Sequence, residues 1–137
     1  MTDNCYPMGF EDLWRQVRVD GWTCGVRSDA TVQILAEGVE MSFAAVPTDD
    51  PEAFGLAAVV GSPEGLPDGG RLCEEALAWN AGHRTTLALV GETPKLRVAL
   101  CARGGHALDP AHLREAIREV AETARIWKDK LERAQIA

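Results

Sequence analysis

Cys101 and His106 are the two residues whose types and spacing come nearest to a catalytic pair. A cysteine thiolate is a nucleophile, and a neighbouring imidazole can take up its proton. Such a pair also needs a third group that orients the histidine and donors that stabilise an oxyanion, and no pattern in the sequence supplies them. We therefore interpret Cys101 as a strand-surface residue and His106 as a loop residue. The sequence predicts a protein that is not an enzyme.

Metal and nucleotide binding are the next chemistries to consider. The three histidines, His83, His106 and His112, do not combine with the cysteines at the spacing of a zinc site. Residues 49–52 are acidic but lack the D-x-[DN]-x-[DN]-G pattern of a calcium loop. Phosphate-binding loops, dinucleotide fingerprints and the hydrolase G-x-S-x-G elbow are also missing. We expect no metal and no cofactor, and we interpret the acidic segment as a solvated loop.

The bulk composition predicts one folded domain spanning residues 1–137. The chain is 46% hydrophobic and 26% charged, as in ordinary folded proteins, and has a net charge of -7. That charge argues against a nucleic-acid partner, which would require a clustered excess of Lys and Arg. Residues 1–75 carry 14 acidic and 4 basic side chains, or -10, and residues 76–137 carry 7 and 10, or +3. This asymmetry indicates either a solvated acidic face or a partner surface.

Three sequence features predict the cellular compartment: apolar runs, the N-terminal residues and the spacing of the cysteines. No apolar run approaches the roughly 18–20 residues that span a bilayer. The N-terminus has neither the basic nor the apolar segment of a signal peptide. The four cysteines form no C-x-x-C pair, so reduced thiols are expected. We predict a cytoplasmic protein without membrane insertion.

Hydrophobic periodicity predicts the elements of the first half. Apolar residues at helical spacing place a helix over residues 8–19. Strands follow at 31–36 and 39–46, joined by the tight-turn pair Glu37-Gly38. The second strand alternates, with Val39, Met41, Phe43 and Ala45 on one face and Glu40, Ser42, Ala44 and Val46 on the other. A third strand at 54–61 is apolar on both faces, which is typical of a central or covered strand.

The second half contains a helix, a hairpin and a long last helix. Asp68 caps a helix that runs to about Asn80 and is ended by Gly82. Strands at 85–90 and 95–103 form the hairpin. Asp109 and Pro110 are a typical helix start. The last helix then carries one apolar stripe, Leu113, Ile117, Val120, Ala124, Trp127 and Leu131. The order is α-β-β-β-α-β-β-α, an α+β fold with an antiparallel sheet flanked by helices.

A set of ordered motifs in residues 72–131 resembles a known family. They are Ala78-x-Asn80 before a glycine, the strand segments 86–89 and 95–100, the Leu-Asp step at 108–109, and a final helix with Ala124-x-x-Trp127. This set resembles the C-terminal half of class I type III secretion chaperones, the Tir chaperone family. The first half agrees in element order. YbjN-like domains share that order, so a YbjN-like adaptor dimer with a folded partner is the alternative.

The resemblance implies a function and two surfaces. Members of this family are small acidic homodimers that bind an extended segment of a secretion effector and keep it export-competent. The twofold contact implied for this chain involves the second helix and the strand after it, through Leu77, Trp79, Thr85 and Leu87. The family also points to the first helix and the adjacent sheet face as the effector surface. That surface would consist of Leu13, Val17, Val32, Ile34, Met41 and Phe43.

The residues themselves give this binding surface partial support and leave one alternative open. The acidic first half would keep an apolar groove soluble and attract a basic segment. A single stripe on the last helix is not expected to cover all the apolar strand residues, although the same six residues would also suit a core. Among the tryptophans, Trp14 and Trp22 are candidate partner anchors, whereas Trp79 and Trp127 are expected in the core.

Overall fold

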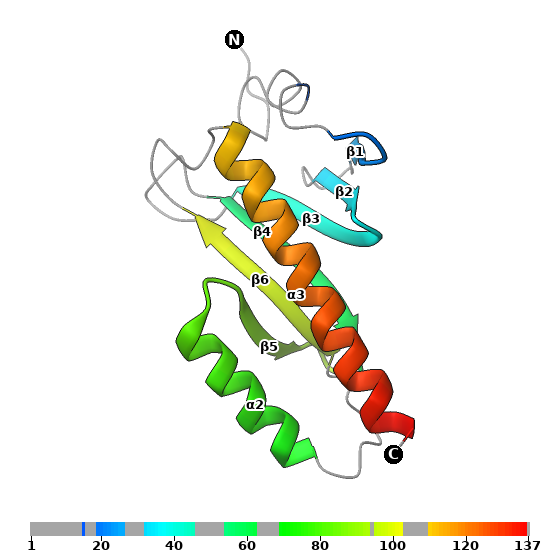
Figure 1. Ribbon diagram of the computed structural model, residues 1–137, viewed down its shortest axis with the longest axis vertical. Helices are drawn as coiled ribbons and strands as arrows, with labels where there is room; N and C mark the ends of the chain where they lie inside the picture. The colour runs from blue at the N-terminus through cyan, green and yellow to red at the C-terminus, as the bar shows by residue number, and fades with distance from the viewer. Residues whose placement is uncertain are drawn as a thin grey trace.

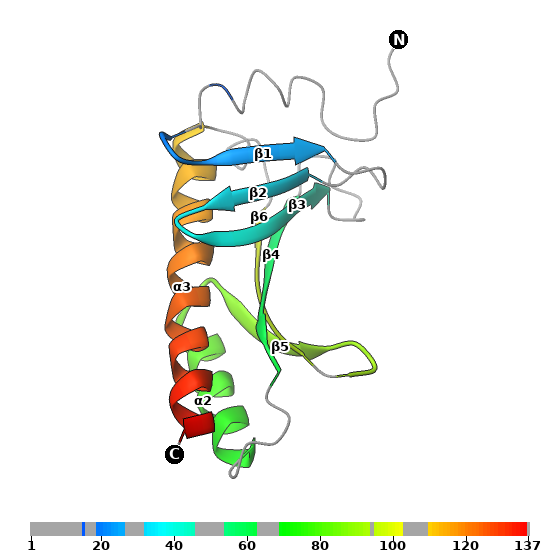
Figure 2. The same ribbon diagram turned by 90° about the vertical axis from the view of Figure 1, so that its right-hand side faces the viewer.

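In the part of the chain that the structure describes, a six-stranded antiparallel sheet carries helices α2 and α3 on one of its faces (Figures 1 and 2). A computed structural model of the chain describes residues 15, 19–26, 32–45, 54–62, 69–93, 95–102 and 110–136. The helix predicted at 8–19 lies outside the described residues except for Arg15 and Val19. The described elements are β1 Thr23–Val26, β2 Val32–Ala36, β3 Val39–Ala45, β4 Phe54–Gly61, α2 Gly69–Gly82, β5 Thr86–Val90, β6 Lys95–Ala102 and α3 Pro110–Ile136.

The strands lie in the order β1-β2-β3-β4-β6-β5. The β2–β3 turn has positive φ at both central residues, 53° at Glu37 and 78° at Gly38, as a two-residue hairpin of the right twist requires. Ala36 and Val39 are directly paired on either side of it. Strand β4, the strand that is apolar on both faces, lies in the middle of the sheet between β3 and β6. The α+β prediction with an antiparallel sheet and helices is therefore confirmed.

One strand was not predicted. Strand β1 pairs with β2 from Thr23↔Leu35 to Val26↔Val32 and adds a sixth strand at the sheet edge. Its sequence, TCGV, is four residues long and contains Gly25, so it carries little strand propensity of its own. Pairing with β2 supplies the stability that the local sequence lacks.

Helix α3 crosses β2, β3, β4 and β6 and forms one wall of the core (Figure 2). At 27 residues it is about 40 Å long, enough to span the sheet. All six residues of its predicted stripe are at most 5% exposed. Small residues beside the stripe, Ala116 and Ala121, are buried as well and allow the helix to lie close to the strands. The apolar strand residues facing it complete the core.

Helix α2 packs on β5 in the same layer as α3, and its C-terminal turn is tied to both neighbours. The rings of Trp79 and Trp127 meet edge to face with centroids 6.0 Å apart. Trp79 Nε1 donates to Thr85 Oγ1 at 3.0 Å. Thr123 donates its hydroxyl proton to Glu119 O at 2.8 Å, so in the 3.1 Å contact between the two threonines Thr85 is the donor. This chain of hydrogen bonds fixes the α2–β5 connection against α3.

Asn80 of α2 pairs its side-chain amide with the backbone of β5, which is the edge strand of the sheet. Its Nδ2 donates to Leu87 O at 3.0 Å, and Leu87 N donates to its Oδ1 at 2.7 Å. The side chain thus takes the position that a neighbouring strand would otherwise occupy. This contact gives a physical reason for an asparagine at the third position of the Ala-x-Asn motif.

We expect Asn80→Asp to lower the free energy of unfolding by about 1–3 kcal/mol, because it removes the donor to Leu87 O and brings a carboxylate against that carbonyl. Urea denaturation measures the loss, and amide exchange at Leu87 should accelerate. The matched control is Ala81→Asp, which adds the same charge at the next, exposed position of α2. Equal stability of the two variants would contradict the role assigned to Asn80.

Candidate partner-binding surface

The structure corrects the strand residues predicted to bind a partner. Val32, Ile34, Met41 and Phe43 are at most 1% exposed, because their side of β2 and β3 faces α3. They are core residues, and the stripe of α3 covers more of the sheet than the sequence analysis expected. The other two predicted residues, Leu13 and Val17, lie outside the described residues.

Trp22 is also a core residue rather than a partner anchor. It is 4% exposed, and its Nε1 donates to Glu37 Oε2 at 2.9 Å. The guanidinium of Arg118 lies over the indole ring, 5.6 Å from its centroid. A tryptophan held by a hydrogen bond and a cation–π contact within its own chain has no surface left to offer. Trp14 lies outside the described residues.

The opposite face of the sheet is open: none of the described helices or strands lies on it (Figure 2). The strand residues that alternate with the core residues point to this side, and most of them are small or uncharged. Among the described residues, two large apolar side chains are exposed there, Leu35 at 42% and Val59 at 59%. The other outward residues on the described strands are Thr23, Gly25, Gln33, Glu40, Ser42, Gly55, Ala57, Thr86, Ala88, Val90, Lys95, Arg97, Ala99 and Cys101.

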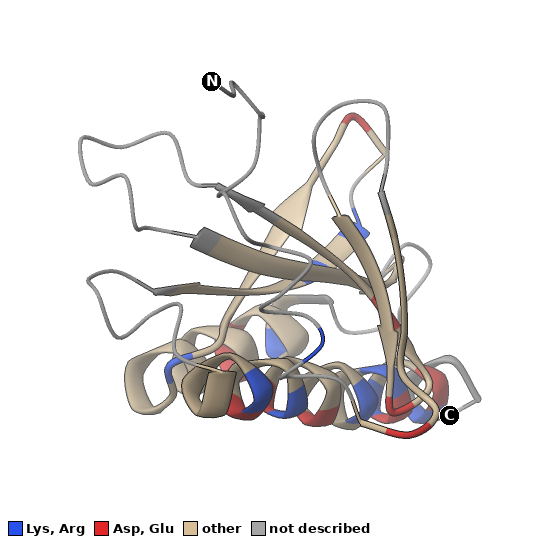
Figure 3. Ribbon diagram, turned by 90° about the horizontal axis from the view of Figure 1, so that it is seen from above, with Lys and Arg blue, Asp and Glu red and all other residues tan. Residues whose placement is uncertain are grey.

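Most of the charged residues coloured in Figure 3 lie on the two helices, on the far side from this open face. Several of them form ion pairs, among them the i,i+4 pair Arg133–Asp129 at 3.0 Å and the pair of Lys130 with Glu75 at 3.5 Å. Exposed pairs of this kind add little stability. The helix layer is therefore a solvated, internally matched surface, and the sheet face differs from it in both charge and polarity.

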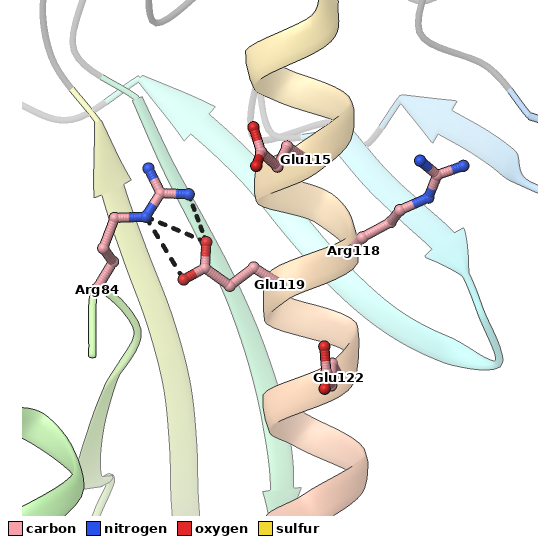
Figure 4. A pocket seen from close by; sticks show the side chains of 5 residues that line it. All are labelled: Arg84, Glu115, Arg118, Glu119 and Glu122. Atoms are coloured by element: carbon pink, nitrogen blue, oxygen red, sulfur yellow. Dashed lines mark hydrogen bonds and ion pairs between the residues drawn. The ribbon is translucent and has the colours of Figure 1, made fainter. Parts of the chain in front are cut away.

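A shallow hollow beside α3 is the most polar feature of the helix layer (Figure 4). Arg84 and Glu119 form a two-pronged ion pair in it, with Arg84 Nε 3.2 Å from Glu119 Oε2. The hydrogen bond with Glu119 raises the pKa of the Arg84 guanidinium above its ordinary value. Glu115, Arg118 and Glu122 also line the hollow, and the Arg118 guanidinium lies over the Trp22 ring. The Arg84–Glu119 pair joins the segment after α2 to the surface of α3.

The residues considered for catalysis and metal binding do not form a site among the described residues. Cys101 is exposed on the open sheet face, and His106 lies outside the described part of the chain. Burial raises the pKa of the Cys24 thiol, which keeps it protonated. His83 stacks on Trp79 with ring centroids 3.6 Å apart and donates from Nδ1 to Trp79 O. In the described segments no three His, Cys, Asp or Glu side chains are grouped to hold a metal ion.

The four residues of the predicted dimer contact differ in how accessible they are. Leu77 is 69% exposed on α2 and is the most exposed of the large apolar residues described. Trp79 is half-buried against Trp127, whereas Thr85 and Leu87 are 1% and 6% exposed and belong to the interior of the chain. Leu89, which the sequence analysis did not single out, is 48% exposed on β5. The large apolar side chains that α2 and β5 expose are therefore Leu77 and Leu89 rather than the four predicted residues as a set.

The comparison with known proteins rests on structure. No family model and no curated protein sequence matches the chain. A chain in the structure of the HopA1–SchA chaperone–effector complex matches with a TM-score of 0.65 and 13% identity, over 86% of this chain and 88% of that one. The Yersinia pestis type III secretion chaperone SycH, solved in complex with a stable fragment of YscM2, matches with a TM-score of 0.59 and 8% identity, over 85% and 93%.

These matches define the class of fold. The chain has the α+β fold of type III secretion chaperones, and the match extends over most of its length and most of theirs. The fold that the sequence resemblance implied is thereby confirmed. Among the described residues, neither helix is long and apolar enough to cross a membrane.

Proposed function

We propose that this protein is a cytoplasmic, non-catalytic chaperone that binds an extended segment of a type III secretion effector and keeps it competent for export. The observation that carries the proposal is the fold shared over 86% of the chain with a chain of a chaperone–effector complex. A second chaperone with the same fold was also solved with a bound protein fragment. The class I, Tir-family assignment belongs to the same proposal and rests on the motifs of residues 72–131.

The open sheet face suits such a partner physically. It offers exposed Leu35 and Val59 among small, mostly uncharged neighbours, so an extended chain can lie flat against it. A segment without its own fold gains apolar contacts there and loses conformational freedom in exchange. The bound segment would then remain unfolded until export.

Co-expression tests this function. The chain is produced with an effector encoded beside its gene, either intact, reduced to its N-terminal segment, or lacking that segment. We expect the isolated segment to co-purify and to be protected from proteolysis by the chain, and the truncated effector to be lost. Binding to the folded remainder instead would support an adaptor of the YbjN-like kind. No complex with any of the three effector forms would contradict the proposal.

We further propose that the chain is a homodimer, with Leu77 and Leu89 on α2 and β5 in the contact. Such an interface should bury about 1,200–2,000 Å² in total. Leu77→Asp should then give a folded monomer at tens of micromolar by light scattering, because it places a charge in an apolar contact. Ile126→Asp, at a residue 36% exposed on α3, is the matched control and should remain dimeric. A monomeric native chain, or a dimer broken by the control alone, would refute this interface.

A further inference from the structure

Two basic residues on the open sheet face have no acidic partner among the residues that the structure describes. Lys95 and Arg97 lie two residues apart on β6 and point away from the core, since Leu96 and Val98 between and after them are buried under the helices. Neither Lys95 nor Arg97 takes part in the ion pairs of the helix layer or makes any other salt bridge within the described part of the chain. The described outward residues of the sheet thus carry two bases and one acid, in a chain whose net charge is -7.

The one acid on this face does not neutralise them. Glu40 lies on β3 and accepts a hydrogen bond from Gln33 Nε2 at 3.1 Å. Glu40 pairs with Leu35 of β2, and the direct pairing of β3 with β4 begins only at Ser42↔Ala57. Strand β4 lies between β3 and β6, so it separates Glu40 from both bases. The bases therefore form a positive spot on an otherwise nearly neutral face.

Arg97 is the more constrained of the two bases. It is half-buried, and its Nε is buried without a hydrogen-bond partner among the described residues. Its cross-strand neighbours are Val59 on β4 and Ala88 on β5, and Ala99 follows on its own strand. None of these side chains can accept a hydrogen bond. A buried donor of a charged group that stays unpaired is costly, which favours a partner that supplies an acceptor.

We infer that the open face recognises an acidic side chain in the bound extended segment, with its carboxylate at Arg97 and an adjacent apolar side chain of the segment against Val59. This inference rests on the proposed function and adds a specificity determinant to it. Charge complementarity selects the occupant: a carboxylate accepts two hydrogen bonds from one guanidinium, and Lys95 adds long-range attraction. The neighbours Ala88 and Ala99 carry no polar side-chain group that would compete with the carboxylate for the guanidinium.

The sequence analysis expected the opposite charge preference. The acidic first half suggested a basic segment, but the described acids of that half do not gather on the open face, where Glu40 is the single example. The net charge of the chain affects how fast a charged segment approaches, whereas one side chain recognises a group of the bound segment at contact distance. The two effects are therefore separate. An acidic residue flanked by apolar residues is therefore the motif that the face selects.

The test uses immobilised peptides of alternating Val and Ser with Glu, Gln or Lys at the central position. We expect the Glu peptide to bind the native chain at least about tenfold more tightly than the Gln peptide, and the Lys peptide to bind most weakly. Arg97→Gln should remove the difference between Glu and Gln, and Arg97→Glu should make the Lys peptide the preferred one. The control Lys128→Gln removes a charge from an exposed position of α3 and should leave the preference unchanged.

A fourth variant supplies the carboxylate from within the chain. Val59→Glu places an acid directly across from Arg97 and should reduce binding of the Glu peptide to the level of the Gln peptide, with an unchanged circular dichroism spectrum. Three results would overturn the inference: equal binding of the three peptides, no binding of any of them, or a preference for the Glu peptide that persists in Arg97→Gln. If the effector segment still co-purifies with the chain, these outcomes leave the proposed function unchanged. If the effector segment does not co-purify, the proposed function itself is refuted.

Discussion

Phe43→Asp should prevent the chain from folding, whereas Val59→Asp should fold normally. Phe43 is 1% exposed and is paired with Val32 and Leu56, both of which are also buried against α3. A carboxylate there loses the apolar contacts of the ring and is buried without a partner, a cost of several kcal/mol. Native domains are stable by about 5–15 kcal/mol in total, so this change removes most or all of that margin.

Circular dichroism and urea denaturation of the two variants provide the measurement. Val59 is the matched control because it lies on a neighbouring strand of the same sheet but is 59% exposed on the open face. The comparison therefore isolates which side of the sheet receives the charge. A folded Phe43→Asp variant that has lost partner binding alone would restore the binding role that the sequence analysis gave to this residue.

The sequence predicted the elements well where periodicity and turn chemistry agreed. The alternation in β3 and β6 correctly separated the buried residues of those strands from the outward ones, and Glu37-Gly38 set the β2–β3 register. The spacing of the last helix identified all six buried stripe residues. In each case a local pattern is sufficient, because register and helical period are decided by near neighbours.

Which sheet face remains open could not be derived in the same way. Alternation divides β2 and β3 into two sets of residues but does not say which set α3 covers, and the sequence analysis assigned Val32, Ile34, Met41 and Phe43 to the wrong one. The open face was marked by a weaker signal, the small residues of β4 and β6 together with an unmatched Arg97. Thr85 was likewise predicted to lie at the dimer surface, but it is buried. Its hydrogen-bond partners, Trp79 and Thr123, come from two different helices, so their contact with Thr85 could not be predicted from the sequence.

Trp127→Ala should lower the free energy of unfolding by about 3–5 kcal/mol, the typical cost of removing a buried tryptophan side chain. Trp127 is 1% exposed. Its ring meets Trp79 of α2 edge to face, and the ammonium of Lys130 lies 5.5 Å from the ring centroid. The sequence placed it in the core from spacing alone. Chemical denaturation of the purified variant measures the loss.

Two conservative variants separate packing from hydrogen bonding. Trp127 Nε1 is buried without a hydrogen-bond partner among the described residues, so Trp127→Phe loses no such bond and should cost clearly less than Trp127→Ala. Trp79→Phe removes the donor to Thr85 Oγ1 and should weaken the α2–β5 connection through that lost bond. If Trp127→Ala melted like the native chain and lost partner binding instead, Trp127 would belong to a binding surface. Because its side chain fills the junction of α2, α3 and the sheet, we expect the loss to appear in stability first.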